Sequence, residues 1–189
     1  MNVKKFLLSF IFLSVLSTTA NAATFKLDSI YTTVSFRVKH LMGYAVGSFT
    51  KFDGAIQLND GNDAVTAVNG TVDMTTIDTR HKDRDNDLRS ARFFDVEKFP
   101  TMTFKSTKIE KNKITGDLTL HGVTKKVTLD YAFWGLAKDQ RGKTKTAVSI
   151  SGVVNRKDFG IVYNIKTDDG TWLLGDEVEL RIELHGILK

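Results

Sequence analysis

The feature of this sequence that most constrains its fold is an alternation of apolar and polar residues with a period of two. Val34, Phe36 and Val38, for example, are separated by Ser35 and Arg37. Successive side chains of a β-strand point to opposite faces, so the pattern predicts strands with one buried and one solvated face. Eight segments show it, at residues 34–38, 52–58, 68–74, 102–104, 118–120, 127–133, 148–154 and 178–184.

Short turn-forming sequences separate these segments, including Asn59-Asp60-Gly61 and Asp168-Asp169-Gly170. Clusters of Asn, Asp and Gly between apolar runs are typical of tight turns. Many amphipathic strands joined by short turns predict an all-β, antiparallel fold. A sheet of this size either stacks on a second sheet or closes into a barrel.

One segment, residues 79–92, interrupts the strand pattern. It carries charge on all sides, and its only apolar side chains are Leu88 and Ala91. We interpret it as a short surface helix that precedes Phe93 and Phe94. A run of charges of this kind is also typical of a simple solvated helix face.

Residues 1–22 are typical of a secretory signal peptide. Lys4 and Lys5 precede a mostly apolar stretch at residues 6–16, and Ala20-Asn21-Ala22 supplies the small residues of a cleavage site. We therefore predict a mature domain of residues 23–189, located in the periplasm. A chain of that length suits one domain with one core.

Composition and motifs exclude several classes of function. The chain has no cysteine, which rules out disulfides, thiolate metal sites and cysteine nucleophiles. A formal net charge of +5, to which Lys4 and Lys5 contribute, is too small to indicate a nucleic-acid partner. No later apolar run has membrane length, so no stable membrane insertion is expected.

Catalytic and metal-binding patterns are also missing from the sequence. The four histidines show no metal-ligand spacing, and there is no G-x-S-x-G elbow or phosphate-binding loop. We therefore predict a protein that is not an enzyme and has neither a metal site nor a cofactor. The histidines are His40, His81, His121 and His185.

Several sequence blocks carry a family resemblance. They are residues 85–95 (DNDLRSARFFD), 99–106 (FPTMTFKS) and 116–125 (GDLTLHGVTK), with shorter matches at 34–36 (VSF), 40–41 (HL), 47–49 (GSF) and 155–160 (NRKDFG). Taken together, and in their order along the chain, these blocks resemble the YceI-like family of periplasmic polyisoprenoid-binding proteins. The resemblance covers nearly all of the predicted mature chain, and the combination is far more specific than any single block.

The resemblance implies a lipocalin-like antiparallel barrel of eight strands with a short capping helix. It also implies a long hydrophobic tunnel for a polyprenyl chain, a polyprenyl quinone or a comparable lipid. This chain departs from the family pattern at Asp87, where a histidine is usual, and at Tyr31-Thr32, where a His-Ser pair is usual. If either histidine contacts a lipid head group in the family, the head-group preference of this chain differs.

Apolar residues of the strands are candidates for the tunnel wall, although composition alone favours an ordinary filled core. Tyr44, in an expected loop over residues 40–47, is a candidate for the entrance. The predicted lipid-binding residues are Val34, Phe36, Val38, Tyr44, Phe52, Met74, Phe93, Phe94, Met102, Phe104, Leu118, Leu129, Tyr131, Phe133, Val154 and Phe159.

Arginines near the expected helix are candidates for head-group binding: Arg84 and Arg89, with Arg156 after a strand. A guanidinium fits a pyrophosphate, whereas a neutral quinone needs only hydrogen-bond donors. Neighbouring aspartates, such as Asp83 and Asp85, cancel much of the positive field. We therefore predict a neutral or weakly polar head group, such as a quinone, an alcohol or an amide.

The predicted function is a periplasmic carrier that sequesters one long-chain isoprenoid or similar lipid. Two alternatives stay open at this point: an enzyme that acts on a lipid held in the barrel, and an interaction module whose barrel is filled. Shifted pKa values inside the tunnel would favour the first. An exposed apolar patch over a packed interior would favour the second. The sequence leaves the oligomeric state open, a homodimer included.

Overall fold

The computed structural model describes residues 22–189, most of which are β-strand. The strands are β1 (Thr24–Leu27), β2 (Thr33–His40), β3 (Gly43–Phe49), β4 (Phe52–Leu58), β5 (Val65–Asp73), β6 (Ile77–Asp78), β7 (Thr101–Glu110), β8 (Lys113–Leu120), β9 (Val123–Lys138), β10 (Thr144–Asn155) and β11 (Leu174–Leu188). The helical segments are α1 (Lys82–Arg89) and the 3-10 turns η1 (Met74–Thr76) and η2 (Arg156–Phe159). The predicted signal segment lies almost entirely outside the described residues.

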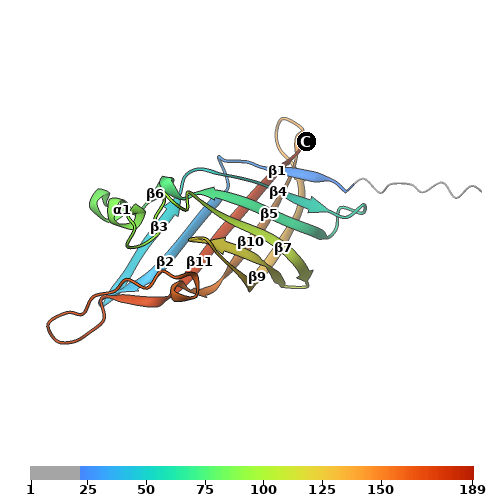
Figure 1. Ribbon diagram of the computed structural model, residues 1–189. Helices are drawn as coiled ribbons and strands as arrows, with labels where there is room; N and C mark the ends of the chain where they lie inside the picture. The colour runs from blue at the N-terminus through green and yellow to red at the C-terminus, as the bar shows by residue number, and fades with distance from the viewer. Residues whose placement is uncertain (1–21) are drawn as a thin grey trace, which may run out of the picture.

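Eight of the strands close into an antiparallel barrel. In spatial order they are β1, β4, β5, β7, β8, β9, β10 and β11, and β1 pairs with β11 to complete the ring (Figure 1). The predicted all-β class, the eight-stranded closed barrel and the single short helix are confirmed. Closure leaves no free sheet edge around the ring, which suits a small antiparallel fold.

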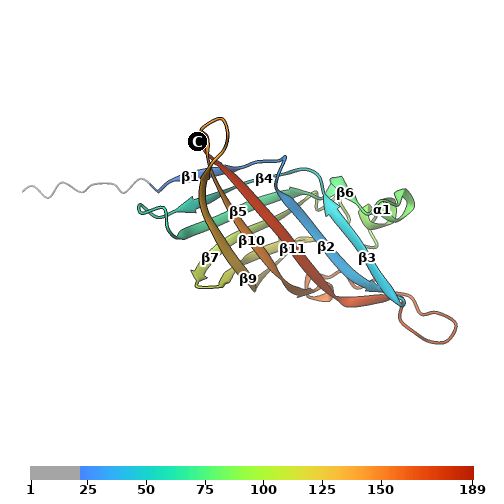
Figure 2. The same cartoon turned by 180° about the vertical axis from the view of Figure 1, so that it is seen from behind.

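The remaining strands extend the barrel at one end. β11 pairs with β1 through Gly186 to Leu188, and earlier along the same edge it pairs with β2. β3 follows β2 in a hairpin, and β6 pairs with the end of β3. Figure 2 shows this extension beside α1, far from the end where β1 begins and β11 ends.

The sequence pattern missed β1, β3 and β6. The segment of β3 contains two glycines and places apolar side chains on both faces, so alternation is hidden there. The expected loop over residues 40–47 is therefore wrong, because β3 begins at Gly43. Tyr44 pairs with Lys39, and both side chains are exposed on the outer face.

The helix is shorter than predicted, and it is anchored at its start. His81 caps it by accepting a hydrogen bond at Nδ1 from the Arg84 N–H (3.3 Å), and Ser90 ends it in an extended conformation. The carboxylate of Asp85 is buried and accepts the backbone N–H of Thr79 at 2.8 Å and its hydroxyl at 2.6 Å. This face of α1 is thus fixed to the end of β6 and is not simply solvated.

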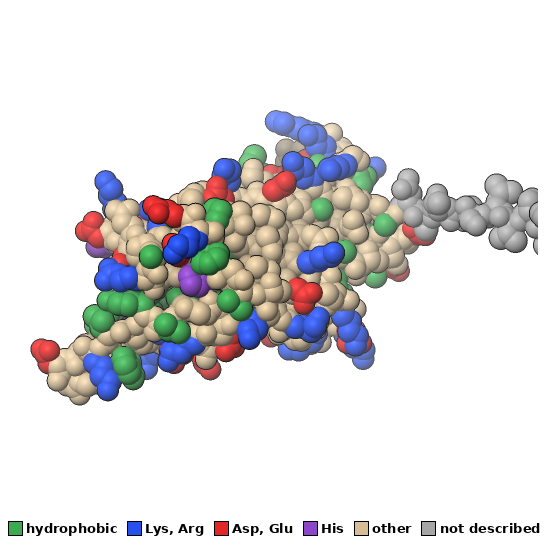
Figure 3. Space-filling view, in the orientation of Figure 1, with side chains coloured by type: hydrophobic (Ala, Val, Ile, Leu, Met, Phe, Trp, Pro, Cys, Tyr) green, Lys and Arg blue, Asp and Glu red, His purple; other side chains and the backbone are tan. Residues whose placement is uncertain are grey.

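Alternation along the strands separates an apolar interior from a charged exterior. Lysine, arginine, aspartate and glutamate side chains are scattered over the outer surface (Figure 3). None of the helices among residues 22–189 combines the length and the apolar character needed to cross a membrane. The buried apolar side chains of these residues lie mostly inside the barrel.

Candidate functional site

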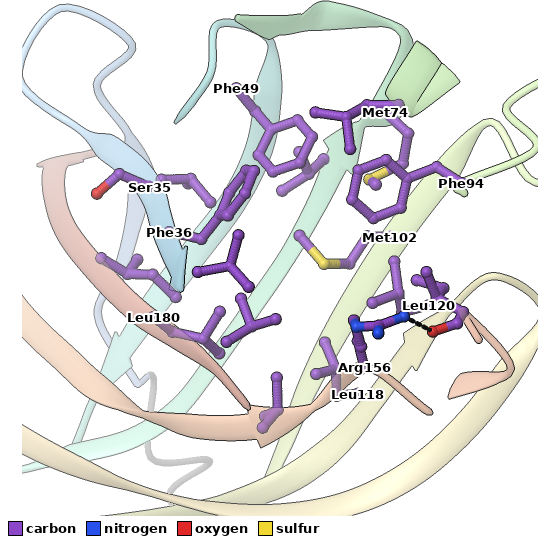
Figure 4. Close-up of a pocket in the computed structure, with 18 of the residues that line it drawn as sticks. Ser35, Phe36, Phe49, Met74, Phe94, Met102, Leu118, Leu120, Arg156 and Leu180 are labelled. Carbon is purple, nitrogen blue, oxygen red and sulfur yellow. Dashed lines mark hydrogen bonds between the residues drawn. The ribbon is translucent and has the colours of Figure 1, made fainter. Parts of the chain in front are cut away.

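An apolar cavity of about 320 Å³ occupies the barrel at the α1 end. This volume lies in the range typical of small-molecule sites. Alternate residues of β2, β4, β5, β7, β8, β10 and β11 contribute to its wall. Figure 4 shows Phe36, Phe49, Phe94, Met102 and Leu180 converging on the cavity from different strands and from the segment after α1. The wall offers dispersion contacts on all sides of a bound apolar group.

The other end of the barrel is filled. Phe25, Ile56, Leu58, Ile114 and Val148 are at most 1% exposed and form one packed cluster. Leu129, Ile150 and Leu184 belong both to this cluster and to the cavity wall. The cavity therefore ends on packed side chains, and its other end adjoins the hollow beside α1.

Two glycines make room for the aromatic rings of the wall. A Cβ on Gly47 would lie 2.5 Å from the Phe36 ring, and a Cβ on Gly116 would lie 2.4 Å from the Phe104 ring. Carbon atoms do not approach so closely, so any larger residue at either position would displace a ring. The glycines thus fix where Phe36 and Phe104 stand in the wall.

The mouth of the cavity is polar. His40, Arg84 and Asp87 line both the apolar cavity and an open hollow beside α1, which His81, Asp83, Asn86, Ser90 and Arg92 complete. No group of three His, Cys, Asp or Glu side chains in residues 22–189 is arranged to hold a metal ion. The mouth is therefore a place for hydrogen bonding to a polar group, beyond which the interior is apolar.

Charges at this mouth are largely paired. Arg84 donates from Nε to the Thr79 hydroxyl (2.9 Å) and from Nη2 to the Thr79 carbonyl (2.8 Å). Asp87 accepts a hydrogen bond from Arg92, and this bond is the main reason why the pKa of Arg92 is raised. Arg92 also donates to the Tyr163 hydroxyl at 3.2 Å. The mouth thus holds one ion pair, Asp87 with Arg92, beside Arg84, whose hydrogen-bond partners on Thr79 are neutral.

Arg156 is a structural residue at the cavity wall. It is 4% exposed, and it donates to the carbonyls of Gly175 (2.9 Å), Ile161 (2.7 Å) and Tyr163 (2.9 Å) and to the carboxylate of Asp176 (2.9 Å). Burial lowers its pKa, and Asp176 partly offsets that effect. The guanidinium therefore holds the segment over residues 160–175 against the barrel and has little capacity left for a ligand.

Of the three head-group candidates, Arg89 lies away from the cavity. Its guanidinium donates to the carbonyls of Thr75 and Ile77, each at 2.8 Å, and so ties the end of α1 to η1 and β6. Arg84 is at the mouth and Arg156 is on the wall. Two of the three predicted arginines, Arg84 and Arg156, therefore line the same cavity.

Twelve of the predicted lining residues lie on the cavity wall, and their contact with a lipid stays a prediction. The other four do not line it. Tyr44 faces outward, and Tyr131 and Phe133 belong to the packed end of the barrel. Phe159, in η2, packs against Leu118 of β8. The twelve on the wall are Val34, Phe36, Val38, Phe52, Met74, Phe93, Phe94, Met102, Phe104, Leu118, Leu129 and Val154.

Tyr131 illustrates why a residue on the inner face need not reach the cavity. It pairs with Ile150 in the sheet and is 8% exposed, deep in the packed cluster. Burial raises the pKa of its phenol to about 12. Alternation gives the face of a strand but not the depth along the barrel axis.

Other wall residues were absent from the predicted set. Phe49, Leu120, Val178, Leu180 and Ile182 lie on the wall, and the same alternation in their strands could have identified most of them. Ile161, Tyr163 and Leu173 come from a segment without regular structure. No periodic signal marks residues of that kind.

The two departures from the family pattern lie in different places. Asp87 is at the mouth, in contact with the cavity and the polar hollow. Tyr31 is half-exposed, with its ring 4.6 Å from the Lys145 ammonium and 5.9 Å from the His185 ring, away from the cavity wall. Only the departure at Asp87 therefore bears on what the cavity accepts.

The fold and the cavity define a small closed antiparallel β-barrel with an internal apolar site, an architecture that lipocalins also have. Residues 25–186 match the family described as the YceI-like domain. The chain belongs to that family.

Relatives and solved structures agree with this assignment. Protein YceI of Salmonella agona is 41% identical, over 98% of both chains. The crystal structure of the Campylobacter jejuni YCEI protein matches with a TM-score of 0.68 at 31% identity, over 80% of this chain and 90% of that one. A polyisoprenoid binding domain from Saccharophagus degradans has the same fold, with a TM-score of 0.64 at 12% identity, over 89% of this chain and 100% of that one.

Proposed function

We propose that this protein is an exported periplasmic carrier that holds one long-chain isoprenoid, or a lipid of similar shape, in its barrel. The observation that carries the proposal is the apolar cavity, closed at one end by packed side chains and bounded at the other by a polar mouth. An amphiphile with a long tail and a small head matches this arrangement. The name of the Saccharophagus degradans barrel supports the choice of an isoprenoid.

Burial of the lipid tail supplies the affinity. Each CH₂-sized unit removed from water contributes about 0.8 kcal/mol, so about twenty units give roughly 16 kcal/mol gross. Ordering a chain with many rotatable bonds takes back much of this gain. The rings of Phe36 and Phe94 are already packed among other side chains, so their own ordering adds little to this cost.

The mouth favours a neutral or weakly polar head group. Arg84 and Arg156 already donate to protein oxygens, and the carboxylate of Asp87 at the opening is already paired with Arg92. A pyrophosphate would need to displace these bonds and approach that carboxylate. A quinone, an alcohol or an amide needs only one or two hydrogen bonds, which His40 or Arg84 can supply.

We infer sequestration and not reaction as the mode of action. The wall is almost wholly apolar, and the charged groups beside it are held in hydrogen bonds that stabilise the fold. The cavity argues against the alternative of an interaction module whose barrel is filled. An enzyme would require a reactive group aimed at the ligand, a role that the hydrogen bonds of Arg84 and Arg156 do not suit.

A titration tests the proposal. Delipidated protein is titrated with a polyprenyl quinone, a polyprenol and a polyprenyl pyrophosphate, each delivered from detergent. We expect saturable binding at one lipid per chain, tighter for the first two ligands than for the pyrophosphate. Absence of saturable binding to all three ligands would contradict the proposal.

A further inference from the structure

Exposed apolar side chains lie beside the cavity entrance on the β2–β3 hairpin and on the neighbouring segment before β11. We call them the mouth patch: Leu41, Met42, Tyr44, Val46, Ile165 and Trp172. Met42, at the tip of the β2–β3 hairpin, is fully exposed, and Trp172 is 58% exposed. Hydrophobic side chains gather at this end of the molecule in Figure 3, opposite the end where the described chain begins.

The two turns form one surface. The Leu41 N–H donates to the Leu173 carbonyl at 2.9 Å, and His40 pairs with Leu174 at the start of β11. The tip of the β2–β3 hairpin therefore lies against the segment that carries Ile165 and Trp172. An apolar surface built on two protruding turns is convex.

The mouth patch is continuous with the cavity. Ile165 is 46% exposed and also lines the cavity wall, whereas the side chain of Val46, 52% exposed, lies with Tyr44 on the outer face of β3. Ile165 thus joins the exposed apolar surface to the interior of the barrel. Exposed apolar surface of this kind marks a site of contact with another apolar phase.

Cations border the patch. The Lys166 ammonium lies 4.8 Å from the Trp172 ring centroid, and the Arg37 guanidinium, which is ion-paired with Glu179 at 2.7 Å, lies 4.6 Å from that of Tyr44. Within residues 22–189 no carboxylate pairs with Lys166 or Lys39. Asp168 and Asp169, on the neighbouring turn, oppose them in part. Asp169 is itself held by the Thr167 hydroxyl at 2.5 Å.

We propose that the mouth patch docks on the surface of an anionic lipid bilayer, so that the lipid ligand enters or leaves the cavity directly from the membrane. The inference rests on the proposed function for the identity of the cargo. Trp and Tyr beside Lys and Arg are the side chains that favour the membrane–water interface, and convex apolar turns insert among lipid head groups. A protein partner would find no flat apolar face here.

The two tryptophans of the chain provide a matched test. Trp134→Phe leaves Trp172 as the only reporter in the mouth patch. Trp172→Phe leaves Trp134, which is 70% exposed on the outer wall of β9 with its indole N–H bonded to Ser149. Each variant is mixed with vesicles of phosphatidylcholine and phosphatidylglycerol that carry brominated acyl chains.

We expect the vesicles to quench Trp172 strongly and to leave Trp134 unchanged. Vesicles of phosphatidylcholine alone should quench Trp172 less, because the bordering cations then lack anionic partners. Equal quenching of both tryptophans, or of neither, would overturn the proposal. So would self-association through the patch, measured by light scattering, if it prevents vesicle binding.

A substitution separates docking from cargo binding. Met42→Asp should weaken vesicle binding by about tenfold, since a carboxylate replaces an inserted apolar side chain. Ile30→Asp, on the exposed turn between β1 and β2, is the matched control and should change nothing. Both variants should bind detergent-delivered lipid normally. If Met42→Asp leaves vesicle binding intact, the docking proposal fails while the carrier proposal stands; if lipid binding from detergent is absent in every protein, the carrier proposal fails.

Discussion

Replacement of Phe104 by aspartate is the most informative single change in the cavity wall. The residue lies on β7, opposite Gly70 on one side and Leu118 on the other, and it lines the cavity. Its ring covers Gly116 so closely that no other residue fits there. Phe104→Asp removes this ring and places a carboxylate among apolar side chains.

Phe104→Asp should lower the free energy of unfolding for two reasons. Loss of a buried phenylalanine side chain costs about 3–5 kcal/mol, and the lower end applies because one side of this ring faces the cavity. Burial of the new carboxylate would raise its pKa by roughly 3 units, which is worth about 4 kcal/mol at neutral pH. Together these terms approach the whole stability of a typical domain, about 5–15 kcal/mol. We expect severe destabilisation and loss of lipid uptake.

The pH dependence identifies the electrostatic part. A carboxylate whose folded pKa is raised binds a proton more readily in the folded state, so the loss of stability should shrink as the pH falls. Urea unfolding at about pH 7 and about pH 5 measures this change. Thr107→Asp, an exposed position on the same strand, is the control and should have little effect. If Phe104→Asp matches Thr107→Asp in both stability and lipid uptake, Phe104 does not face an apolar cavity and the reasoning is wrong.

Three further changes test other parts of the account. Arg84→Ala and Arg89→Ala should each alter lipid affinity by less than about threefold. Added salt should also have little effect on that affinity, because screening acts only on a charged head group. If salt weakens binding strongly and either substitution weakens it too, the head group is a pyrophosphate. Arg156→Met should lower the free energy of unfolding by about 3–5 kcal/mol, as measured in urea, because it leaves the carbonyls of Gly175, Ile161 and Tyr163 without their donor, while Asp176 keeps its ion pair with Lys157. Burial raises the pKa of Tyr131 to about 12, so the stability that its neutral phenol contributes should be complete below about pH 10 and lost as the pH rises towards 12. Tyr131→Phe should remove this loss of stability. Identical alkaline unfolding of the two proteins would refute the assignment.

Alternation made the class of fold predictable, because inward and outward residues alternate along β2, along the first part of β7 and along β11 after its irregular start. It could not reveal β3, where glycines and outward apolar residues hide the period. Nor could it show that β1 and β2 share one edge of β11. That arrangement depends on pairing between residues at least 134 positions apart in the sequence, the separation of His40 and Leu174.

The candidate site was predictable in its strands and less so at its ends. Phe36, Met102 and Phe104 could be placed on the wall because each lies on the apolar face of a strand with clear apolar–polar alternation. The depth at which the packed cluster begins depends on how side chains fill the barrel, so Tyr131 could not be separated from the wall. The role of Arg156 depends on carbonyls of a segment that has no pattern of its own.

The most direct test of the central claim is native mass spectrometry of the protein purified from the organism that makes it, followed by extraction of whatever lipid it carries. The account predicts a complex of one chain with one long-chain isoprenoid or similarly shaped lipid, with a neutral or weakly polar head group, and predicts that Phe104→Asp lacks it. A protein that emerges without lipid, and that takes up none from detergent, would contradict the account.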